Sequence, residues 1–463
     1  MDGLAALASF AWLQGRGAIL LALAVGTIAA SAILTGRRPR DVHKRGARVE
    51  DGWWARRKAR GAAGGRGEGL TLGGIPVALA DETKHFKLIG TTGTGKSTAI
   101  RELIGAALRR GDRAVIADPD GGYLDHFFDR ARGDVLLNPF EPLSARWDLF
   151  AELREPYDVE QLASGLVPSS EDPSGSEWRG YARTFLSAVT RNCHACGRRD
   201  AAELWRLLAS ASVEELQPIV AGTPAQPFLE PANARMFGSI RSVAGSAAAA
   251  LEYVAAQRAP AFSVRDWVER GRGVLFIPYQ ARQVAALRSI IATWMRLAIF
   301  EAMCRPEEDQ RLWFVIDELD ALGAIDGLKD ALARLRKFGG RCVLGLQSIA
   351  QVSSTYGVGQ AQTIVENCGN TLILRCSSSE NGGTAQFASR LIGEREVVRR
   401  QTARGRDRDG RIGASVARRS LNVSDQHTTE YAVLSSEIEQ LPDLAGYLKT
   451  ASSPSWLRVR LAR

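Results

Sequence analysis

The fold is decided by one stretch of the sequence, Gly90-Thr91-Thr92-Gly93-Thr94-Gly95-Lys96-Ser97, with Thr98 directly after it. It matches the phosphate-binding loop pattern G-x-x-x-x-G-K-[ST]. A short apolar run, 86–89, precedes the loop, and apolar residues recur at helical spacing over 99–110. Strand, glycine-rich loop and helix in this order predict an α/β fold with a P-loop nucleotide-binding domain.

The residue types of the loop are those that a nucleoside triphosphate requires. Glycines let the backbone turn its N–H groups onto phosphate, Lys96 can reach the β- and γ-phosphates, and the Ser97 hydroxyl can bind Mg²⁺. We therefore expect residues 90–98 to bind ATP and Ser97 to contribute to a Mg²⁺ site.

A nucleotide hydrolase of this kind also needs an acid at the end of an apolar strand. Two runs compete, 114–118, which ends in Asp118, and 312–318, which ends in Asp317 and Glu318. The second is favoured because it supplies Asp317 for Mg²⁺ and, beside it, Glu318 to orient and deprotonate water. Asp118 would then end a neighbouring strand and stabilise the turn that follows.

Two further residues after Glu318 are candidates for the catalytic site. The apolar run 342–346 predicts a strand beside that of Asp317, and its polar end carries Gln347, where RecA-like motors sense the γ-phosphate. A leucine-rich helix over 328–337 ends in basic residues that include Arg336. Arg336 either complements the helix dipole or acts as an arginine finger on the next subunit's γ-phosphate.

A long insertion separates Lys96 from Asp317. Residues 156–257 contain no convincing strand, and their apolar spacing predicts helices, broken by prolines over 222–231. We expect an all-α domain over 156–257, inserted into a RecA-like domain formed by 70–155 and 258–463.

The N-terminal residues 1–36 are expected to be a membrane anchor. Residues 17–36 carry no charge, and a helix of that length is roughly 30 Å long, enough for one span. Basic residues follow it, which predicts a single-pass protein with its catalytic part in the cytoplasm. A signal-peptidase site at Ala30-Ser31-Ala32 is the alternative, and a second span is left open.

Residues 37–69 are expected to form a basic, glycine-rich cytoplasmic linker. Most of the net charge of +9 lies in residues 37–66, where Lys and Arg far outnumber acids. Attraction to anionic lipid explains this composition more simply than DNA binding. An arginine-rich segment over 397–420 is expected to be an exposed hairpin or loop, either simply solvated or in contact with phosphate.

The six cysteines are scattered, which does not indicate a disulfide framework. Cys193 and Cys196 form an isolated C-x-x-C, and a zinc site needs about four ligands. Two ordinary thiols are the simpler interpretation, and a metal or redox role is the alternative.

From about Gly73 onward, the ordered set of motifs resembles the type IV coupling proteins of conjugation and type IV secretion, relatives of the FtsK and HerA motors. The resemblance rests on the motifs already quoted and on Asp118-Pro119-Asp120-Gly121, Leu137-Asn138-Pro139, Ala333-Arg334-Leu335-Arg336-Lys337-Phe338-Gly339-Gly340 and Leu441-Pro442-Asp443-Leu444. In that family, Gln347 and Arg336 match the γ-phosphate sensor and finger positions. Relatives commonly have two membrane spans, whereas this sequence has one clear candidate.

This resemblance implies a homohexameric ring on the bacterial inner membrane with a central channel for single-stranded DNA. It implies that the protein recruits a relaxase–DNA complex and passes it to the type IV secretion channel proteins. With the residue analysis, it predicts a DNA-dependent ATPase whose catalytic residues are Lys96, Glu318, Gln347 and Arg336. The alternatives are a nucleotide-dependent substrate receptor and a protein-secretion ATPase, neither of which moves DNA.

Overall fold

The computed structural model describes residues 42–52, 69–169, 173–304, 311–379, 382–407 and 418–462. They form two compact units, a larger one within Arg48–Ile392 and Val433–Arg463 and a smaller one within Met1–Ala47 and Gly393–Ala432. The span predicted over 17–36 lies outside the described residues. Within the ranges described, no helix combines the length and the apolar character needed to cross a membrane.

The larger unit is built on a mixed sheet, for which the described ranges supply ten strands. In spatial order these are β2 (Val49–Asp51), β17 (Trp456–Arg460), β16 (Ala445–Lys449), β13 (Asn370–Ile373), β5 (Phe86–Ile89), β12 (Gly340–Leu346), β11 (Leu312–Ile316), β6 (Arg113–Pro119), β10 (Val274–Tyr279) and β7 (Val135–Leu136). Strands β13 to β7 are parallel, whereas β16 is antiparallel to both neighbours. The α/β class and the predicted central strands are confirmed.

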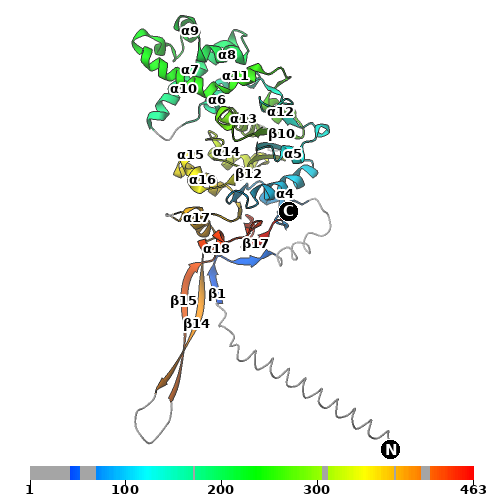
Figure 1. Cartoon of the computed structure of the whole chain (residues 1–463), viewed down its shortest axis with the longest axis vertical. Coiled ribbons are helices and arrows are strands. Elements are labelled where there is room, and N and C mark those ends of the chain that lie inside the picture. Colours follow the sequence, from blue (N-terminus) through cyan, green and yellow to red (C-terminus); the bar gives the residue numbers. More distant parts are fainter. Residues whose placement is uncertain are drawn as a thin grey trace, which may run out of the picture. The chain divides into compact units, whose positions relative to one another are not determined.

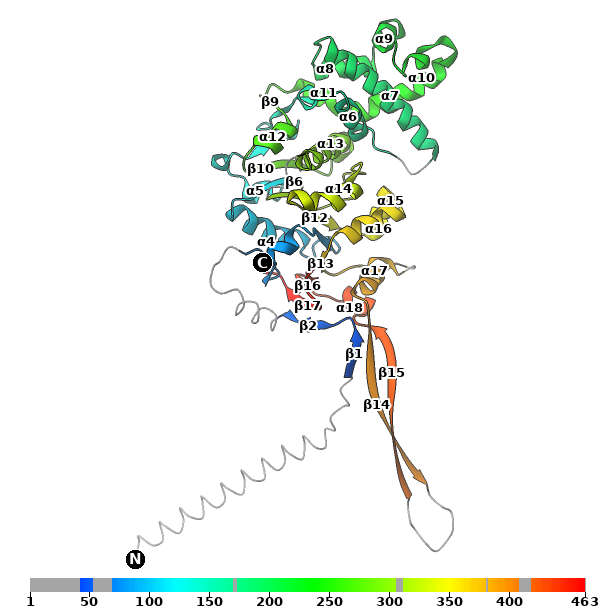
Figure 2. The same ribbon diagram turned by 180° about the vertical axis from the view of Figure 1, so that it is seen from behind.

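Helices cover both faces of this sheet, with α4 (Lys96–Arg109) on one side and α13 (Val284–Ala302) and α14 (Leu328–Leu335) on the other (Figures 1 and 2). Burial on both faces explains why the parallel strands read as continuous apolar runs. Leu88 and Val315, for example, belong to the buried cluster that also contains the apolar side of α4.

The shorter elements of the larger unit complete its layers and connections. They are β3 (Thr71–Leu72), β4 (Ile75–Pro76), α3 (Leu79–Glu82), α5 (Leu124–Phe127), η1 (Arg130–Arg132), β8 (Arg146–Trp147), η2 (Leu149–Glu152), β9 (Ala261–Phe262), α12 (Val264–Arg270), η5 (Arg336–Phe338), α15 (Ile349–Tyr356), α16 (Val358–Asn367), α17 (Gly383–Ile392) and α18 (Ser435–Glu439).

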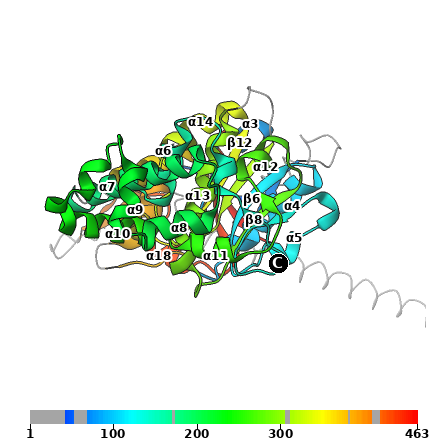
Figure 3. The ribbon, with the colours of Figure 1, turned by 90° about the horizontal axis from the view of Figure 1, so that it is seen from above.

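From α6 to α11 the described residues form helices joined by turns and loops, and they contain no strand. The elements are α6 (Asp158–Leu166), α7 (Pro173–Ala195), α8 (Ala201–Ala209), α9 (Val213–Val220), η3 (Gln226–Leu229), η4 (Pro231–Asn233), α10 (Ala234–Ala248) and α11 (Ala250–Ala256). Helices α7 and α10 pack side by side (Figure 3). The rings of Phe185 and Phe237 meet edge to face, with 5.2 Å between their centroids. Cys193 is buried and Cys196 is exposed, and burial raises the pKa of the Cys193 thiol to about 11.

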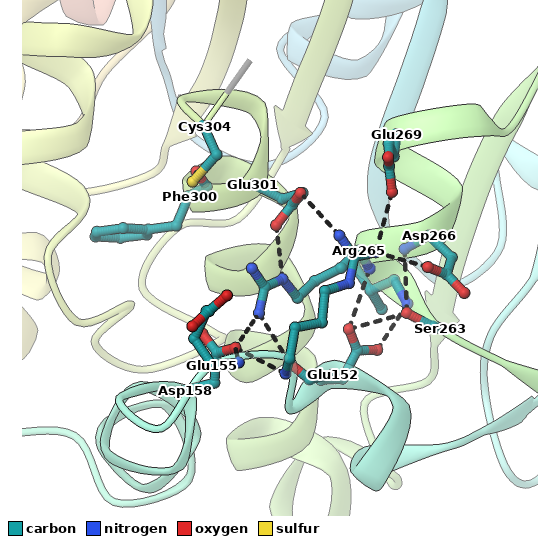
Figure 4. A network of polar contacts seen from close by, with 12 residues as sticks. Glu152, Glu155, Asp158, Ser263, Arg265, Asp266, Glu269, Phe300, Glu301 and Cys304 are labelled. Carbon is teal, nitrogen blue, oxygen red and sulfur yellow. Dashed lines mark hydrogen bonds and ion pairs between the residues drawn. The ribbon is translucent and has the colours of Figure 1, made fainter.

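A buried polar network joins the two chain segments that lead into and out of this helical region (Figure 4). The Glu152 carboxylate accepts hydrogen bonds from the backbone N–H of Val264, at 2.7 Å, and of Arg265, at 3.1 Å. The Arg265 guanidinium in turn pairs with Asp158 at 2.7 Å and with Glu301 of α13 at 2.6 Å. The segment that enters the helical region and the segment that leaves it are therefore attached to each other and to α13.

The smaller unit is an antiparallel sheet of β1 (Val42–Gly46), β14 (Glu394–Asp407) and β15 (Arg418–Tyr431). Strands β14 and β15 pair antiparallel along their length (Figure 1), as expected for a hairpin over 397–420; residues 408–417 between them lie outside the described residues.

The expectation of a linker over 37–69 is wrong for residues 42–51, because these form β1 and β2. Their pairing partners, β14 and β17, lie at the other end of the sequence, and the local basic composition gives no sign of such distant pairing.

Candidate functional site: the phosphate loop and its acidic partners

The phosphate loop connects β5 to α4 at the carboxyl edge of the sheet. Strand β5 lies between β12 and β13, so the loop emerges next to the ends of two parallel strands. Gly95 caps α4 with φ +115°, and a Cβ there would come within 2.8 Å of Leu444 Cδ2, so the position requires glycine. Helix α4 therefore begins at this edge, and the N–H groups of a first helical turn lack partners within the helix, as anion binding requires.

Lys96 is folded into its own loop. Its Nζ donates to the carbonyl oxygens of Gly90, at 2.8 Å, and Thr91, at 3.2 Å, and the residue is 6% exposed. Burial lowers the pKa of Lys96, while the negative charges of Asp317 and Glu318 act in the opposite direction. The ammonium group thus lies inside the loop that the sequence motif assigns to phosphate.

Ser97 and Asp317 meet across the edge of the sheet. The Ser97 hydroxyl donates to Asp317 Oδ2 at 2.7 Å. Asp317 is buried, and its other oxygen, Oδ1, has no hydrogen-bond partner among the described residues. A hydroxyl beside a carboxylate with a spare acceptor is an oxygen ligand set that fits Mg²⁺.

Asp118 is occupied differently. Its carboxylate accepts the backbone N–H of Tyr123, at 3.0 Å, and of Leu124, at 2.6 Å, and so closes the turn after β6. Burial raises the pKa of Asp118 to about 6. Strand β6 is the neighbour of β11, as expected, and of the two competing acids only Asp317 reaches Ser97.

Glu318 and Gln347 form a second pair beside the loop. Gln347 Nε2 donates to Glu318 Oε1 at 2.5 Å, and Thr92 of the loop donates to Gln347 Oε1 at 3.3 Å. Burial, and then the charge of Asp317, raise the pKa of Glu318. A carboxylate with a raised pKa is a better proton acceptor near neutral pH than an ordinary glutamate.

Arg336 is not brought to this site. It lies in η5, directly before β12, whereas the phosphate loop lies beyond the opposite end of β12, where Leu346 pairs with Ile89. The seven residues of β12 separate the two ends by about 20 Å. The Arg336 side chain is exposed.

Two tyrosines that sequence reasoning missed also lie at this edge. The Tyr123 hydroxyl donates to Asp317 Oδ2 at 2.7 Å. Its position directly after the turn that follows the 114–118 strand was an available signal. Tyr279, at the end of β10, is buried, and its hydroxyl has no hydrogen-bond partner in the part of the chain described; nothing in the sequence pattern marks it.

Known proteins resemble this chain over most of its length, including the phosphate loop. Residues 69–462 match the family model for the type IV secretion-system coupling protein DNA-binding domain. The coupling protein TraD of Escherichia coli (strain K12) is 31% identical over 394 residues, which are 83% of this chain and 53% of that protein. The chain spans about half the length of the curated relatives it matches.

Solved structures show the same similarity at the level of the fold. The bacterial conjugative coupling protein TrwBdeltaN70 superposes with a TM-score of 0.79 and 31% identity, over 92% of this chain and 94% of that one. The plasmid coupling protein TrwB in complex with ADP and Mg²⁺ gives the same TM-score at 30% identity, again over 92% and 94% of the two chains.

Proposed function

Because this chain belongs to the type IV secretion-system coupling proteins, we propose that it is an ATP-hydrolysing motor of conjugation. It recruits a relaxase–DNA complex at the bacterial inner membrane and drives single-stranded DNA into the secretion channel. The observation that carries this proposal is the convergence of Ser97, Asp317 and Glu318 at the phosphate loop. The ADP and Mg²⁺ complex of the related TrwB supports nucleotide as the ligand.

Each residue of the site has a role in this chemistry. Lys96 and the N–H groups of residues 90–98 hold the phosphates, and Ser97 and Asp317 hold Mg²⁺. Mg²⁺, when bound there, neutralises charge on the phosphate oxygens. Glu318 orients the attacking water and takes its proton, and Gln347, hydrogen-bonded to Glu318 and Thr92, responds to the γ-phosphate.

The position of Arg336 supports an assembly of several subunits. At about 20 Å from its own loop, its side chain cannot contact the phosphates bound by the same chain. Arg336 is exposed, so it is available to a neighbour's site. A closed ring of six subunits would give every nucleotide site one arginine from the next subunit.

ATP turnover with and without single-stranded DNA tests the proposal. The full chain in lipid nanodiscs should hydrolyse ATP faster when a single-stranded oligonucleotide is added. This stimulation should fade as salt rises, because the contacts are mainly to backbone phosphate. Turnover that is indifferent to DNA would favour a protein-secretion ATPase. Nucleotide binding without turnover would favour a substrate receptor.

Deletion of residues 1–36 tests the membrane part of the proposal. The shortened chain should still hydrolyse ATP but should no longer support conjugative transfer, since those residues only anchor the motor. Full transfer by the shortened chain would remove the anchor from the mechanism.

A further inference from the structure

Two hydroxyl groups converge on one oxygen of Asp317. Ser97 and Tyr123 each donate to Oδ2, both at 2.7 Å, and Oδ1 is left without a partner among the residues described. Ser97 belongs to the phosphate loop, whereas Tyr123 belongs to the segment after β6 and has no part in the recognised nucleotide motifs.

The backbone around Tyr123 is held by several contacts. Asp120 and Gly121 both have positive φ, at 59° and 73°, so the chain turns sharply after β6. The Asp118 carboxylate accepts the N–H of Tyr123, and the N–H of Asp120 donates to the carbonyl of Tyr279 at 2.8 Å. The turn is therefore attached to the ends of both β6 and β10.

The ring of Tyr123 is equally restricted. The residue is 2% exposed and belongs to the core cluster beneath α4. The Arg101 guanidinium of α4 lies 5.8 Å from the ring centroid. With the ring held in this way, the hydroxyl donates to the Asp317 carboxylate.

We propose that Tyr123 is a positioning residue for Mg²⁺. Its hydroxyl fixes the Asp317 carboxylate through Oδ2 and leaves Oδ1 as the acceptor for the ion or its bound water. Mg²⁺ tolerates little deviation from its preferred geometry, and residues that orient its ligands control its affinity. This inference rests on the proposed function, because it assumes that nucleotide and Mg²⁺ bind at this loop.

The simpler explanation is that Tyr123 only fills the core. Tyr123→Phe separates the two explanations, because phenylalanine keeps the buried ring and removes only the hydroxyl. If Tyr123 only packs, the variant should bind Mg²⁺ as the native chain does. If it positions Asp317, the affinity for Mg²⁺ should fall while the affinity for metal-free nucleotide stays unchanged.

The experiment measures binding of a fluorescent ADP analogue to the full chain, first in EDTA and then with increasing Mg²⁺. For Tyr123→Phe, the Mg²⁺ concentration of half-maximal effect should rise about tenfold, with unchanged affinity in EDTA. Tyr356→Phe is the matched control, since it removes another buried hydroxyl, which accepts the N–H of Ile325 at 3.2 Å outside this site. Asp118→Asn, which weakens the support of the turn, should shift the Mg²⁺ dependence in the same direction.

An unchanged Mg²⁺ dependence in a folded Tyr123→Phe protein would overturn the inference. So would an equal shift in Tyr356→Phe, because the effect would then be general. If Tyr123→Phe does not fold, an unchanged Mg²⁺ dependence in folded Asp118→Asn would overturn it instead. Failure of the native chain to bind the analogue at all would count against the proposed function.

Discussion

Gln347 donates its side-chain amide to the Glu318 carboxylate across the carboxyl ends of the adjacent strands β12 and β11. The proposed γ-phosphate sensor and the proposed base are therefore one hydrogen-bonded pair. Thr92 attaches this pair to the phosphate loop. A change at the loop on nucleotide binding would reach the base through one glutamine side chain.

Gln347→Ala should lower the rate of hydrolysis without abolishing ATP binding. Glu318 would lose its side-chain partner, and misplacement of a catalytic group by about 1 Å can reduce rates about 100-fold. We expect kcat to fall about 10- to 100-fold with a small change in KM, measured by steady-state turnover. Gln362→Ala is the control, because Gln362 is exposed and donates to Glu366 of the same helix, away from the phosphate loop. A normal kcat in Gln347→Ala would separate the pair from catalysis.

Glu318→Gln should retain ATP but stall its hydrolysis, because an amide cannot accept the proton of water. The expected loss in kcat is about 10²- to 10⁴-fold, with nucleotide affinity measured in parallel. Since burial raises the pKa of Glu318, activity of the native chain should begin to fall, as pH is lowered, earlier than for an ordinary glutamate base. Native turnover in Glu318→Gln would require Asp118 to be reconsidered as the carboxylate that accepts the proton.

Lys96→Ala should abolish hydrolysis and DNA transfer while the protein still folds. Lys96 donates to two carbonyl oxygens of the loop but does not belong to the apolar core. In thermal unfolding without nucleotide, the midpoint should fall by at most about 2 °C, because about 1 kcal/mol corresponds to a shift of about 1 °C in a chain of this size. Appreciable ATP hydrolysis by the variant would contradict the assignment of the loop.

Arg336 should act on the nucleotide of a neighbouring subunit. Arg336→Ala should lower turnover by about 10³- to 10⁵-fold, and native turnover per subunit should climb steeply with protein concentration. Mixing Arg336→Ala with Glu318→Gln provides the sharper measurement. Each variant should be nearly inactive alone, but a mixed ring would pair an intact Glu318 with a neighbour's intact Arg336. No recovery, in rings shown by native mass spectrometry to be mixed, would exclude the finger in trans.

The buried Glu152 should make stability depend on pH. Burial raises the pKa of Glu152 from 4.5 to about 7, so between these values the folded chain holds a proton that the unfolded chain has released. The stability that protonated Glu152 contributes is complete below pH 4.5 and is lost as pH rises to about 7. Over this range the free energy of unfolding should fall by at most about 1.4 kcal/mol per pH unit. Glu152→Gln should remove this decline in urea unfolding, whereas the exposed Glu252→Gln should keep it.

Much of the nucleotide site could be predicted because its signals are local. A glycine pattern with lysine and serine, set between an apolar run and an amphipathic helix, indicates the loop without any tertiary information. The choice of Asp317 over Asp118 followed from the adjacent Glu318. The structure brings Asp317 to Ser97 and leaves Asp118 to close a turn.

The contacts that could not be predicted are those between segments far apart in sequence. Nothing near Val49 indicates that it pairs with Trp456 in the same sheet. The Tyr123 contact with Asp317 depends on the order of β6 and β11 in the sheet and on a turn with two positive φ values. Neither the strand order nor the turn conformation can be inferred from composition or from the spacing of apolar residues.

The pairing of β2 with β17 bears on how this protein should be handled in the laboratory. Trp456 donates its N–H to the carbonyl of Arg48, and Ser455 donates its hydroxyl to Glu50 at 2.6 Å. A shortened protein that begins in the glycine-rich stretch before Leu70 would lack β2. The backbone of β17 would then be an exposed sheet edge, and exposed edges promote pairing between molecules and aggregation. Trimming upstream of Val42 keeps that edge covered.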